Sequence, residues 1–411
     1  MHGVLGIGII QLLAWGLSEN RARVAWRVVA VGVLLQFGLA LLFLKFPPAR
    51  SAFLLLNRAV EALQNATEAG TGFVFGYLGG GQLPFAETQP GASFIFAFRA
   101  LPLVLVISAL ATLLFYWGVL QRIVQAFAWV LRRAVGVGGP LGLGAAVHIF
   151  VGHIEAPLLI RPYLMRIERG ELFALMSCGM AGIAGTVMVL YATLVGSVIP
   201  NALGNILIAA VISTPAALAI AALMIPFRPD PSPSAQLTID DPPVSSMDAL
   251  AKGTRDGIVF LANIIATLVV AIALVSLVNA ALGLFPDIAG SPVTLQRLFA
   301  YAFQPIMWLI GIPGTETATA AALMGTKTVL NEFVAYVDLA HLPPDALSAR
   351  SRLIMTYALC GFANFGSVGI MIGGMGAMVP DRRPEIVALG LRSVLSGTLA
   401  TCMSGAVIGM L

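Results

Sequence analysis

The sequence predicts an all-α protein that crosses a membrane several times. Of its 411 residues, 59% are hydrophobic and only 10% are charged, and the mean hydropathy is +0.94. Soluble domains contain about 45–50% apolar and about 25% charged residues. A water-soluble fold of this length could not bury so much apolar surface, so lipid must be the solvent for most of the chain. The 43 glycines and 24 prolines agree with this, because transmembrane helices tolerate both residue types.

Apolar runs of the length that spans a bilayer recur along the chain. A transmembrane helix needs about 20 such residues. We expect about eight helices of this kind, at residues 3–17, 27–45, 95–118, 172–198, 203–226, 256–284, 353–379 and 386–410. Residues 51–68 differ, since their apolar side chains recur at helical spacing with Arg58, Glu61 and Glu68 opposite. This pattern predicts an amphipathic helix that lies in the membrane interface.

One polar stretch divides the chain. Residues 228–247 are rich in proline, polar and acidic, which is typical of a linker. The expected organisation is N-terminal membrane helices with the interfacial helix at 1–92, a first half of the core at 93–227, the linker at 228–250, and a second half of the core at 251–411.

Two further regions, 137–165 and 304–336, are apolar enough to enter the membrane but too broken to cross it. Each contains glycine, proline and at least one carboxylate. We expect each to form a re-entrant helical hairpin. Broken elements at corresponding positions of two halves indicate an inverted-repeat transport core and mark its binding site.

The net charge of +4 does not indicate a nucleic-acid partner. The basic residues stand in short clusters between apolar runs, as in Arg21, Arg23 and Arg27, which is the distribution of cytoplasmic anchors. The three cysteines all have apolar surroundings and no paired spacing, so we expect neither a disulfide nor a zinc site. The low lysine content and the absence of a targeting peptide favour a multi-pass protein of a bacterial inner membrane.

Two carboxylates are predicted to lie at membrane depth. An ionisable residue there costs about 2.5–3.5 kcal/mol, so Glu155 and Glu332 each need a reason to be present. Asn331 and Lys327 add polar groups near Glu332. A solvated position at the interface is the alternative for both carboxylates.

A third polar group consists of Asn364 and Ser367. Residues three apart share one face of a helix, and the flanking glycines and Phe362 would allow that helix to unwind around a ligand. The alternative is that Asn364 and Ser367 only bond a neighbouring helix.

Four strings occur in order and give the sequence a family resemblance: AVHIFVGHIEAPLLIRPYL, GELFALMSCGMAGIAGTV, MGTKTVLNEFVAY and YALCGFANFGSVGIMIGG. Together they resemble the concentrative nucleoside transporter family. The resemblance implies import of nucleosides by cation symport and alternating access, with no catalytic residue. It also implies a homotrimer whose protomers each build a site from two hairpins and two interrupted helices. By analogy Glu332, Phe362, Asn364 and Ser367 hold the ribose.

The expected nucleobase side departs from the family pattern. The family usually has Gly-Gln-Thr/Ser-Glu where this chain has Gly152, His153, Ile154 and Glu155. Val187 matches a site-lining position on the next helix. Histidine can still bond a base edge, whereas isoleucine offers only apolar contact, so the base preference is expected to differ.

The expected cation site departs further. In sodium-coupled relatives an asparagine and a serine donate oxygen ligands to the cation, where this chain has His148 and Gly182. Of the family's ligands, only the backbone carbonyls of Val151 and Ile183 could remain. Sodium is a hard cation that prefers several oxygen ligands, and histidine titrates near neutrality. We therefore favour proton coupling, with His148, His153 or Glu155 as carrier. Sodium coupling through a rearranged site, and histidines that merely pack, stay open as alternatives.

Other function classes remain as alternatives. A facilitative nucleoside carrier, a carrier of a related substrate, or a sensor that binds without transport would use the same residues. A passive channel would need a continuous polar stripe through the bilayer. A membrane metalloenzyme would need three metal ligands, and His148, His153 and Glu155 lack the spacing for one helical face. We expect no bound metal and no cofactor other than the coupling cation, H⁺ or Na⁺.

Overall fold

The computed structural model describes residues 2–87, 93–153, 155–229, 241–288 and 290–411, and in these ranges the fold is helical apart from one isolated bridge. The first half contains α1 (His2–Gly16), α2 (Trp26–Lys45), α3 (Pro47–Phe75), α4 (Phe96–Arg99), α5 (Leu103–Tyr116), α6 (Val119–Val135), α7 (Gly139–Val147), α8 (Glu155–Leu159), α9 (Arg169–Ala181), α10 (Gly185–Val195) and α11 (Ala202–Met224). The second half contains α12 (Ser246–Leu282), α13 (Leu295–Leu309), α14 (Thr317–Val329), α15 (Glu332–His341), α16 (Ala349–Leu359), α17 (Phe365–Met378) and α18 (Arg383–Met410).

Most predicted spans coincide with long apolar helices. Within the described ranges, the segments long and apolar enough to cross a membrane are Trp26–Lys45, Phe96–Tyr116, Arg169–Val195, Ala202–Met224, Ser246–Leu282 and Pro380–Met410. Shorter apolar helices cover Gly3–Gly16 and Phe365–Met378. Together these segments overlap the eight predicted from hydropathy, which confirms the all-helical, multi-pass fold class.

Two spans that hydropathy predicts as continuous are interrupted. The first breaks between α9 and α10, where Gly182 has an extended backbone. The second breaks between α16 and α17, where Asn364 has an extended backbone and caps α17. Each break exposes helix ends inside the protein, so the free backbone groups need partners there.

The two broken regions form pairs of short helices. In the first region, α7 ends at Val147 and α8 begins at Glu155. In the second, α14 ends at Val329 and α15 begins at Glu332. The predicted range 304–336 therefore begins too early, because it includes the end of the separate helix α13. Re-entry of these pairs into a bilayer stays a prediction.

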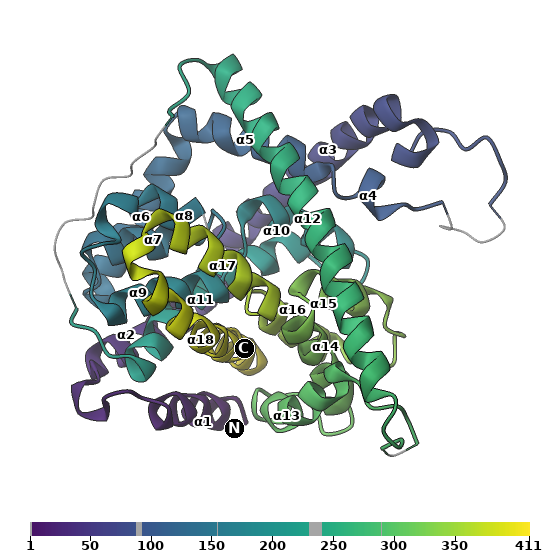
Figure 1. Ribbon diagram of the computed structural model, residues 1–411. Helices are drawn as coiled ribbons and strands as arrows, with labels where there is room; N and C mark the ends of the chain where they lie inside the picture. The colour runs from purple at the N-terminus through teal and green to yellow at the C-terminus, as the bar shows by residue number, and fades with distance from the viewer. Residues whose placement is uncertain (1, 88–92, 154, 230–240, 289) are drawn as a thin grey trace.

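The predicted linker at 228–250 extends too far. Its residues 230–240 lie outside the described ranges, but α12 already begins at Ser246, since the Ser245 side chain caps it by accepting a hydrogen bond from the Asp248 backbone N–H at 3.1 Å. The interfacial helix predicted at 51–68 lies within the longer helix α3, which projects from the body together with α4 (Figure 1).

The core is centred on α11. Within its apolar window 94% of the residues are buried, and α2, α9, α10 and α18 surround it. Hydrogen bonds join three of these helices: Gln36 Nε2 donates to Ser404 Oγ at 3.0 Å, and the Ser213 and Ser404 hydroxyls lie 2.9 Å apart. Such polar contacts hold helices together where lipid removes the hydrophobic driving force.

Helix α12 stands apart from this core. It packs along α5 through Gly253 and Gly257, where a Cβ atom would lie 2.7 Å from the Ala109 Cα and 3.1 Å from the Leu105 Cα, respectively. This small-residue contact, with glycines four apart, allows the two backbones to approach closely. Figure 1 shows α12 running diagonally across the molecule in front of the core.

Candidate functional site

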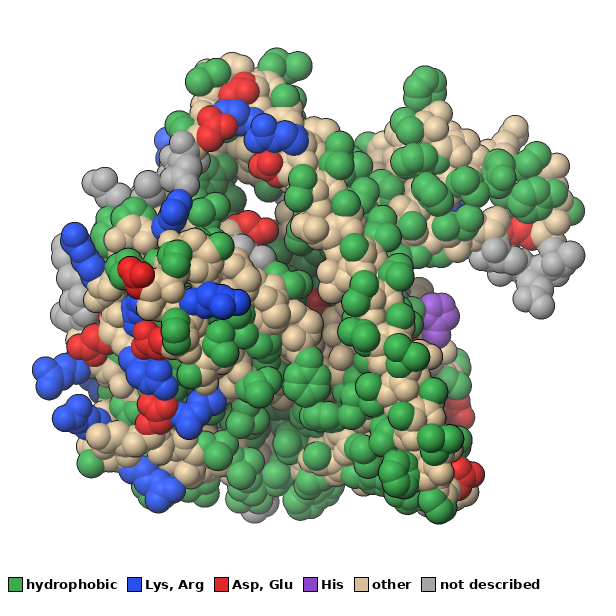
Figure 2. Space-filling view, viewed as in Figure 1, with side chains coloured by type: hydrophobic (Ala, Val, Ile, Leu, Met, Phe, Trp, Pro, Cys, Tyr) green, Lys and Arg blue, Asp and Glu red, His purple; other side chains and the backbone are tan. Residues whose placement is uncertain are grey.

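A cavity of about 490 Å³ lies between α12 and the helix breaks of the core. Figure 2 shows the surface hollowed beside α12. The cavity-lining residues include His153, Glu155, Val187, Glu332, Phe362, Asn364 and Ser367. All the predicted substrate-binding residues within the described ranges are thus brought together, although they come from segments far apart in the sequence. Ile154, the remaining one, lies outside the described residues.

Glu332 is held at the start of α15. Asn331 caps this helix, since its side-chain oxygen accepts from the Val334 N–H at 2.9 Å. The Glu332 side chain is buried, and each carboxylate oxygen has a donor: the Tyr191 hydroxyl at 2.7 Å from Oε1 and the Asn364 amide at 3.0 Å from Oε2. The carboxylate is therefore an oriented acceptor inside the protein rather than a solvated group.

The other polar group named near Glu332 has a different task. Lys327 is fully buried, and its Nζ donates to the Ala358 carbonyl at 2.8 Å and to the Thr401 hydroxyl at 3.1 Å. It thereby joins α14 to the end of α16 and to α18. A cation near the carboxyl end of a helix is favourable because the last carbonyls lack intrahelical donors.

Asn364 and Ser367 do not share a helical face as expected. Asn364 precedes α17, and its Oδ1 accepts from the Ser367 N–H at 2.8 Å. The asparagine thus uses its oxygen to cap the helix and its amide nitrogen to orient Glu332. Capping competes well with helix formation for asparagine, which explains why the helix breaks here.

Another part of the cavity wall contains the residues predicted to face the nucleobase. The His153 ring packs against the Phe362 ring, with centroids 4.9 Å apart. His153 Nε2 has no hydrogen-bond partner in the described part of the chain. Glu155 begins α8, and its carboxylate lies against Gly152, where an added Cβ atom would have to displace it.

His148 lies behind this wall and does not line the cavity. It is 2% exposed, and neither ring nitrogen finds a partner among the residues that the structure describes. A Cβ atom on Gly182 would lie 3.2 Å from the His148 carbonyl oxygen, so the two residues that replace the expected sodium ligands are neighbours. Val151 lies in the break between α7 and α8, and Ile183 lies in the break between α9 and α10.

Residues on two helices line or support the site although they were not predicted from the sequence. Tyr191, the hydroxyl donor to Glu332, lies one helical turn after Val187 on α10, and this spacing was the available signal. The long helix α12 contributes Asp256, Asn263 and Thr267 to the cavity lining.

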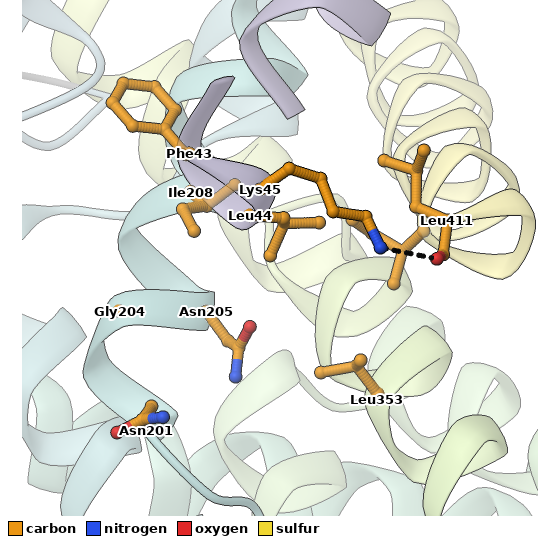
Figure 3. Close-up of a pocket in the computed structure, with 10 residues that line it drawn as sticks. Phe43, Leu44, Lys45, Asn201, Gly204, Asn205, Ile208, Leu353 and Leu411 are labelled. Carbon is orange, nitrogen blue, oxygen red and sulfur yellow. Dashed lines mark hydrogen bonds between the residues drawn. The ribbon is translucent and has the colours of Figure 1, made fainter. Parts of the chain in front are cut away.

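A second cavity, of about 500 Å³, opens between the ends of α2 and α18 and the start of α11 (Figure 3). None of the predicted site residues lines it. Its Lys45 Nζ donates to the Leu411 carbonyl oxygen at 3.3 Å. In the described part of the chain, no group of three or more His, Cys, Asp or Glu side chains could hold a metal ion.

Comparison with known proteins places this arrangement in a family. The family described as Na⁺-dependent nucleoside transporter matches through its C-terminal profile at residues 205–409 and its N-terminal profile at 5–78, and a nucleoside recognition (Gate) profile matches residues 97–198. An uncharacterized transporter of Haemophilus influenzae is 35% identical over 100% of this chain and 97% of its own length. The mouse solute carrier family 28 member 3 is 34% identical over 99% of this chain, which spans 58% of that protein.

Solved structures agree with these matches. CNTnw in an inward-facing substrate-bound state has a TM-score of 0.89 and 33% identity, covering 100% of this chain and 98% of CNTnw. A CNTnw variant in an outward-facing state has a TM-score of 0.87 and 32% identity, covering 100% and 97%. These proteins are transporters rather than enzymes. The profiles, the relatives and the shared fold show that the chain belongs to the concentrative nucleoside transporter family.

Proposed function

We propose that this protein imports nucleosides across a membrane by cation symport and alternating access. The observation that carries the proposal is the buried Glu332 carboxylate, oriented by Tyr191 and Asn364 at the edge of a cavity between α12 and the core. Related proteins named for sodium/nucleoside cotransport and the inward- and outward-facing states of CNTnw support it.

The chemistry of this site suits a sugar diol. A carboxylate accepts hydrogen bonds from two hydroxyls, while the Asn364 and Ser367 side chains can both donate and accept. Phe362 and Val187 add apolar surface next to these groups. Buried polar groups that lack partners are costly, so a ligand that offers several hydroxyls in a small volume is favoured over an apolar one.

We further propose proton coupling. His148 and Gly182 supply no side-chain oxygen at the expected sodium site, whereas both ring nitrogens of the buried His148 lack a partner within the described ranges. An imidazole can take up and release a proton, which is the property that a proton carrier needs. Sodium coupling would have to rely on backbone carbonyls, such as those of Val151 and Ile183.

The assembly and location follow from the resemblance. We propose a homotrimer in a bacterial inner membrane. Within the apolar window of α12 no residue is buried in the single chain, so this helix has a large surface that lipid or neighbouring protomers would cover.

The proposal is tested by uptake of radiolabelled uridine and adenosine into proteoliposomes. Three conditions are compared: an inward proton gradient, an inward sodium gradient, and neither. We expect uphill accumulation only with the proton gradient. Accumulation driven only by sodium would overturn proton coupling, and equilibration without accumulation would identify a facilitative carrier. If neither nucleoside enters under any condition, nucleoside transport itself is wrong.

A histidine substitution sharpens this test. We expect His148→Leu to abolish proton-driven accumulation while nucleoside exchange across the membrane persists, because His148 lies outside the cavity that would hold the substrate. The matched control is His341→Leu at the exposed end of α15, which should accumulate uridine as the unmodified protein does. Equal proton-driven accumulation in both variants would exclude His148 as the proton carrier.

A further inference from the structure

One side of helix α12 forms the cavity wall that lies across from the core. Its cavity-lining residues are Asp256, Val259, Phe260, Asn263, Ile264, Thr267, Leu268 and Ala271. Their spacing alternates between three residues and one, which is the pattern of a single face of an α-helix. This face extends over several helical turns opposite the breaks that position Glu332 and Asn364.

In the apolar part of α12, most of the few polar residues lie on this face. Between residues 257 and 278 the only polar side chains are Asn263, Thr267 and Ser276, and the first two line the cavity. A polar side chain in an apolar membrane helix normally bonds a neighbouring helix. Asn263 and Thr267 make no side-chain hydrogen bond within the described part of the chain, so nothing in the fold accounts for them.

Their spacing suits one small ligand. Asn263 and Thr267 are four residues apart, which places them one above the other at about 6 Å along the helix axis. Asp256 lies on the same face about 10 Å further along; it is exposed and 3.7 Å from Arg255. The apolar Phe260 and Ile264 separate these polar groups.

The two walls of the cavity are held by different contacts. α12 is fixed to α5 through Gly253 and Gly257, whereas Glu332, Asn364 and Tyr191 are joined to one another within the core. A ligand that binds both sets of groups therefore bridges α12 and the core.

We infer that Asn263 and Thr267 form a second part of the substrate site and recognise polar groups of the nucleoside that Glu332 and Asn364 do not hold. This inference rests on the proposed function. The Asn263 amide offers both a donor and an acceptor, which matches the paired donor and acceptor on the edge of a nucleobase, and the Thr267 hydroxyl adds one adaptable group. Residues of α12 thereby contribute to the choice of base.

The test uses isosteric substitutions in the full-length protein. Asn263→Leu and Thr267→Val remove the polar groups while keeping shape, and Ser276→Ala, on the same helix but outside the cavity, is the matched control. Initial rates of uridine and 3-methyluridine uptake are measured in proteoliposomes. The thermal stability of each purified variant is measured alongside.

We expect each cavity-facing substitution to raise the KM for uridine about 3- to 10-fold, as the loss of one hydrogen bond implies. Asn263→Leu should also reduce the preference for uridine over 3-methyluridine, whose base edge lacks the donor. Thr267→Ser should restore the KM, and Ser276→Ala should leave it unchanged.

The outcomes separate the inference from the function on which it rests. If Asn263→Leu and Thr267→Val keep the normal KM and the normal preference while uridine is transported, the inference is wrong and the proposed function stands. If the unmodified protein transports neither substrate, the proposed function fails and the inference fails with it. A variant too unstable to assay is replaced by Asn263→Ala, judged by the same criteria.

Discussion

The two sides of the cavity differ in how their buried polar groups are partnered. On one side, Glu332, Tyr191 and Asn364 form a hydrogen-bonded group in which both carboxylate oxygens have donors. On the other side, Nε2 of His153, which lines the cavity, and both ring nitrogens of His148, which lies behind it, find no partner among the described residues. Both sides are formed at helix breaks and both are buried, so burial alone does not cause the difference.

The difference separates two tasks. A pre-organised carboxylate is ready for a ligand of fixed shape, because its orientation is already determined before the ligand arrives. Unpartnered imidazole nitrogens in a buried position are costly unless a water molecule or a ligand supplies the missing hydrogen-bond partner. Under the proposed function, the carboxylate side would recognise the sugar, and the histidine side is where we propose that protonation changes.

The largest expected effect comes from breaking the carboxylate side. Glu332→Gln keeps the size of the side chain but places an amide nitrogen where a donor from Tyr191 or Asn364 already points. Hydrogen bonds to charged groups contribute about 1.5–3 kcal/mol each. Because the variant loses one such bond and offers only a neutral acceptor to the other donor, uridine uptake should fall by about 100-fold. The measurement is the initial rate of uptake in proteoliposomes.

The control for this variant removes a carboxylate elsewhere. Asp345→Asn changes an exposed residue in the connection between α15 and α16 and should leave uptake unchanged. Normal uptake by Glu332→Gln would mean that the hydrogen-bonded group around Glu332 only supports the fold. The role in substrate recognition would then belong to the histidine side.

Much of the fold could be predicted because a lipid bilayer limits the hydropathy patterns that a membrane-spanning chain can have. A bilayer requires apolar runs of about 20 residues, and these runs locate the long helices. Hydropathy could not locate the interruption at Gly182 or the one before α17, since one glycine or one asparagine hardly changes a window average. The start of α12 was also missed, because the cap formed by Ser245 lies inside a polar stretch that reads as linker.

The candidate site was predictable only where the residues are unusual for a membrane. Glu155 and Glu332 attract attention because carboxylates are expensive there. Tyr191 was missed because an aromatic residue in an apolar helix normally packs, and only the fold shows its hydroxyl 2.7 Å from Glu332. Asn263 and Thr267 were missed for a similar reason: sequence cannot distinguish a polar group that bonds a neighbouring helix from one that lines a cavity.

Tyr191 sharpens the comparison with a smaller effect. Tyr191→Phe removes one of the two donors to Glu332 but leaves the ring, which packs against Tyr336 with centroids 5.2 Å apart. We expect the KM for uridine to rise about 10-fold, corresponding to about 1.4 kcal/mol. The check is the KM together with the midpoint of thermal unfolding.

Tyr336→Phe is the matched control, since it also removes a buried hydroxyl. That hydroxyl donates to the Thr356 carbonyl at 2.7 Å, so this variant should lose stability while keeping its KM. If Tyr191→Phe instead lowers stability at an unchanged KM, its hydroxyl supports the fold and does not prepare Glu332 for the substrate.

The smallest expected effect concerns α12, the helix that forms the remaining wall of the cavity. Gly253→Ala adds a methyl group that would lie 2.7 Å from the Ala109 Cα and 2.8 Å from the Ser108 carbonyl oxygen. Because backbone atoms cannot move aside as a flexible side chain could, the substitution should push α12 away from α5. Overpacking of this kind costs about 1–3 kcal/mol, which thermal unfolding of the purified protein in detergent would detect.

Gly8→Ala in α1 is the comparison for that experiment, since nothing lies within 4 Å of the added methyl group. It should be neutral or slightly stabilising, because alanine favours a helix by about 1 kcal/mol relative to glycine. If both variants unfold at the same temperature, the contact between α12 and α5 is loose. The cavity would then have one fixed wall, the carboxylate side, and a position of α12 that a bound substrate could adjust.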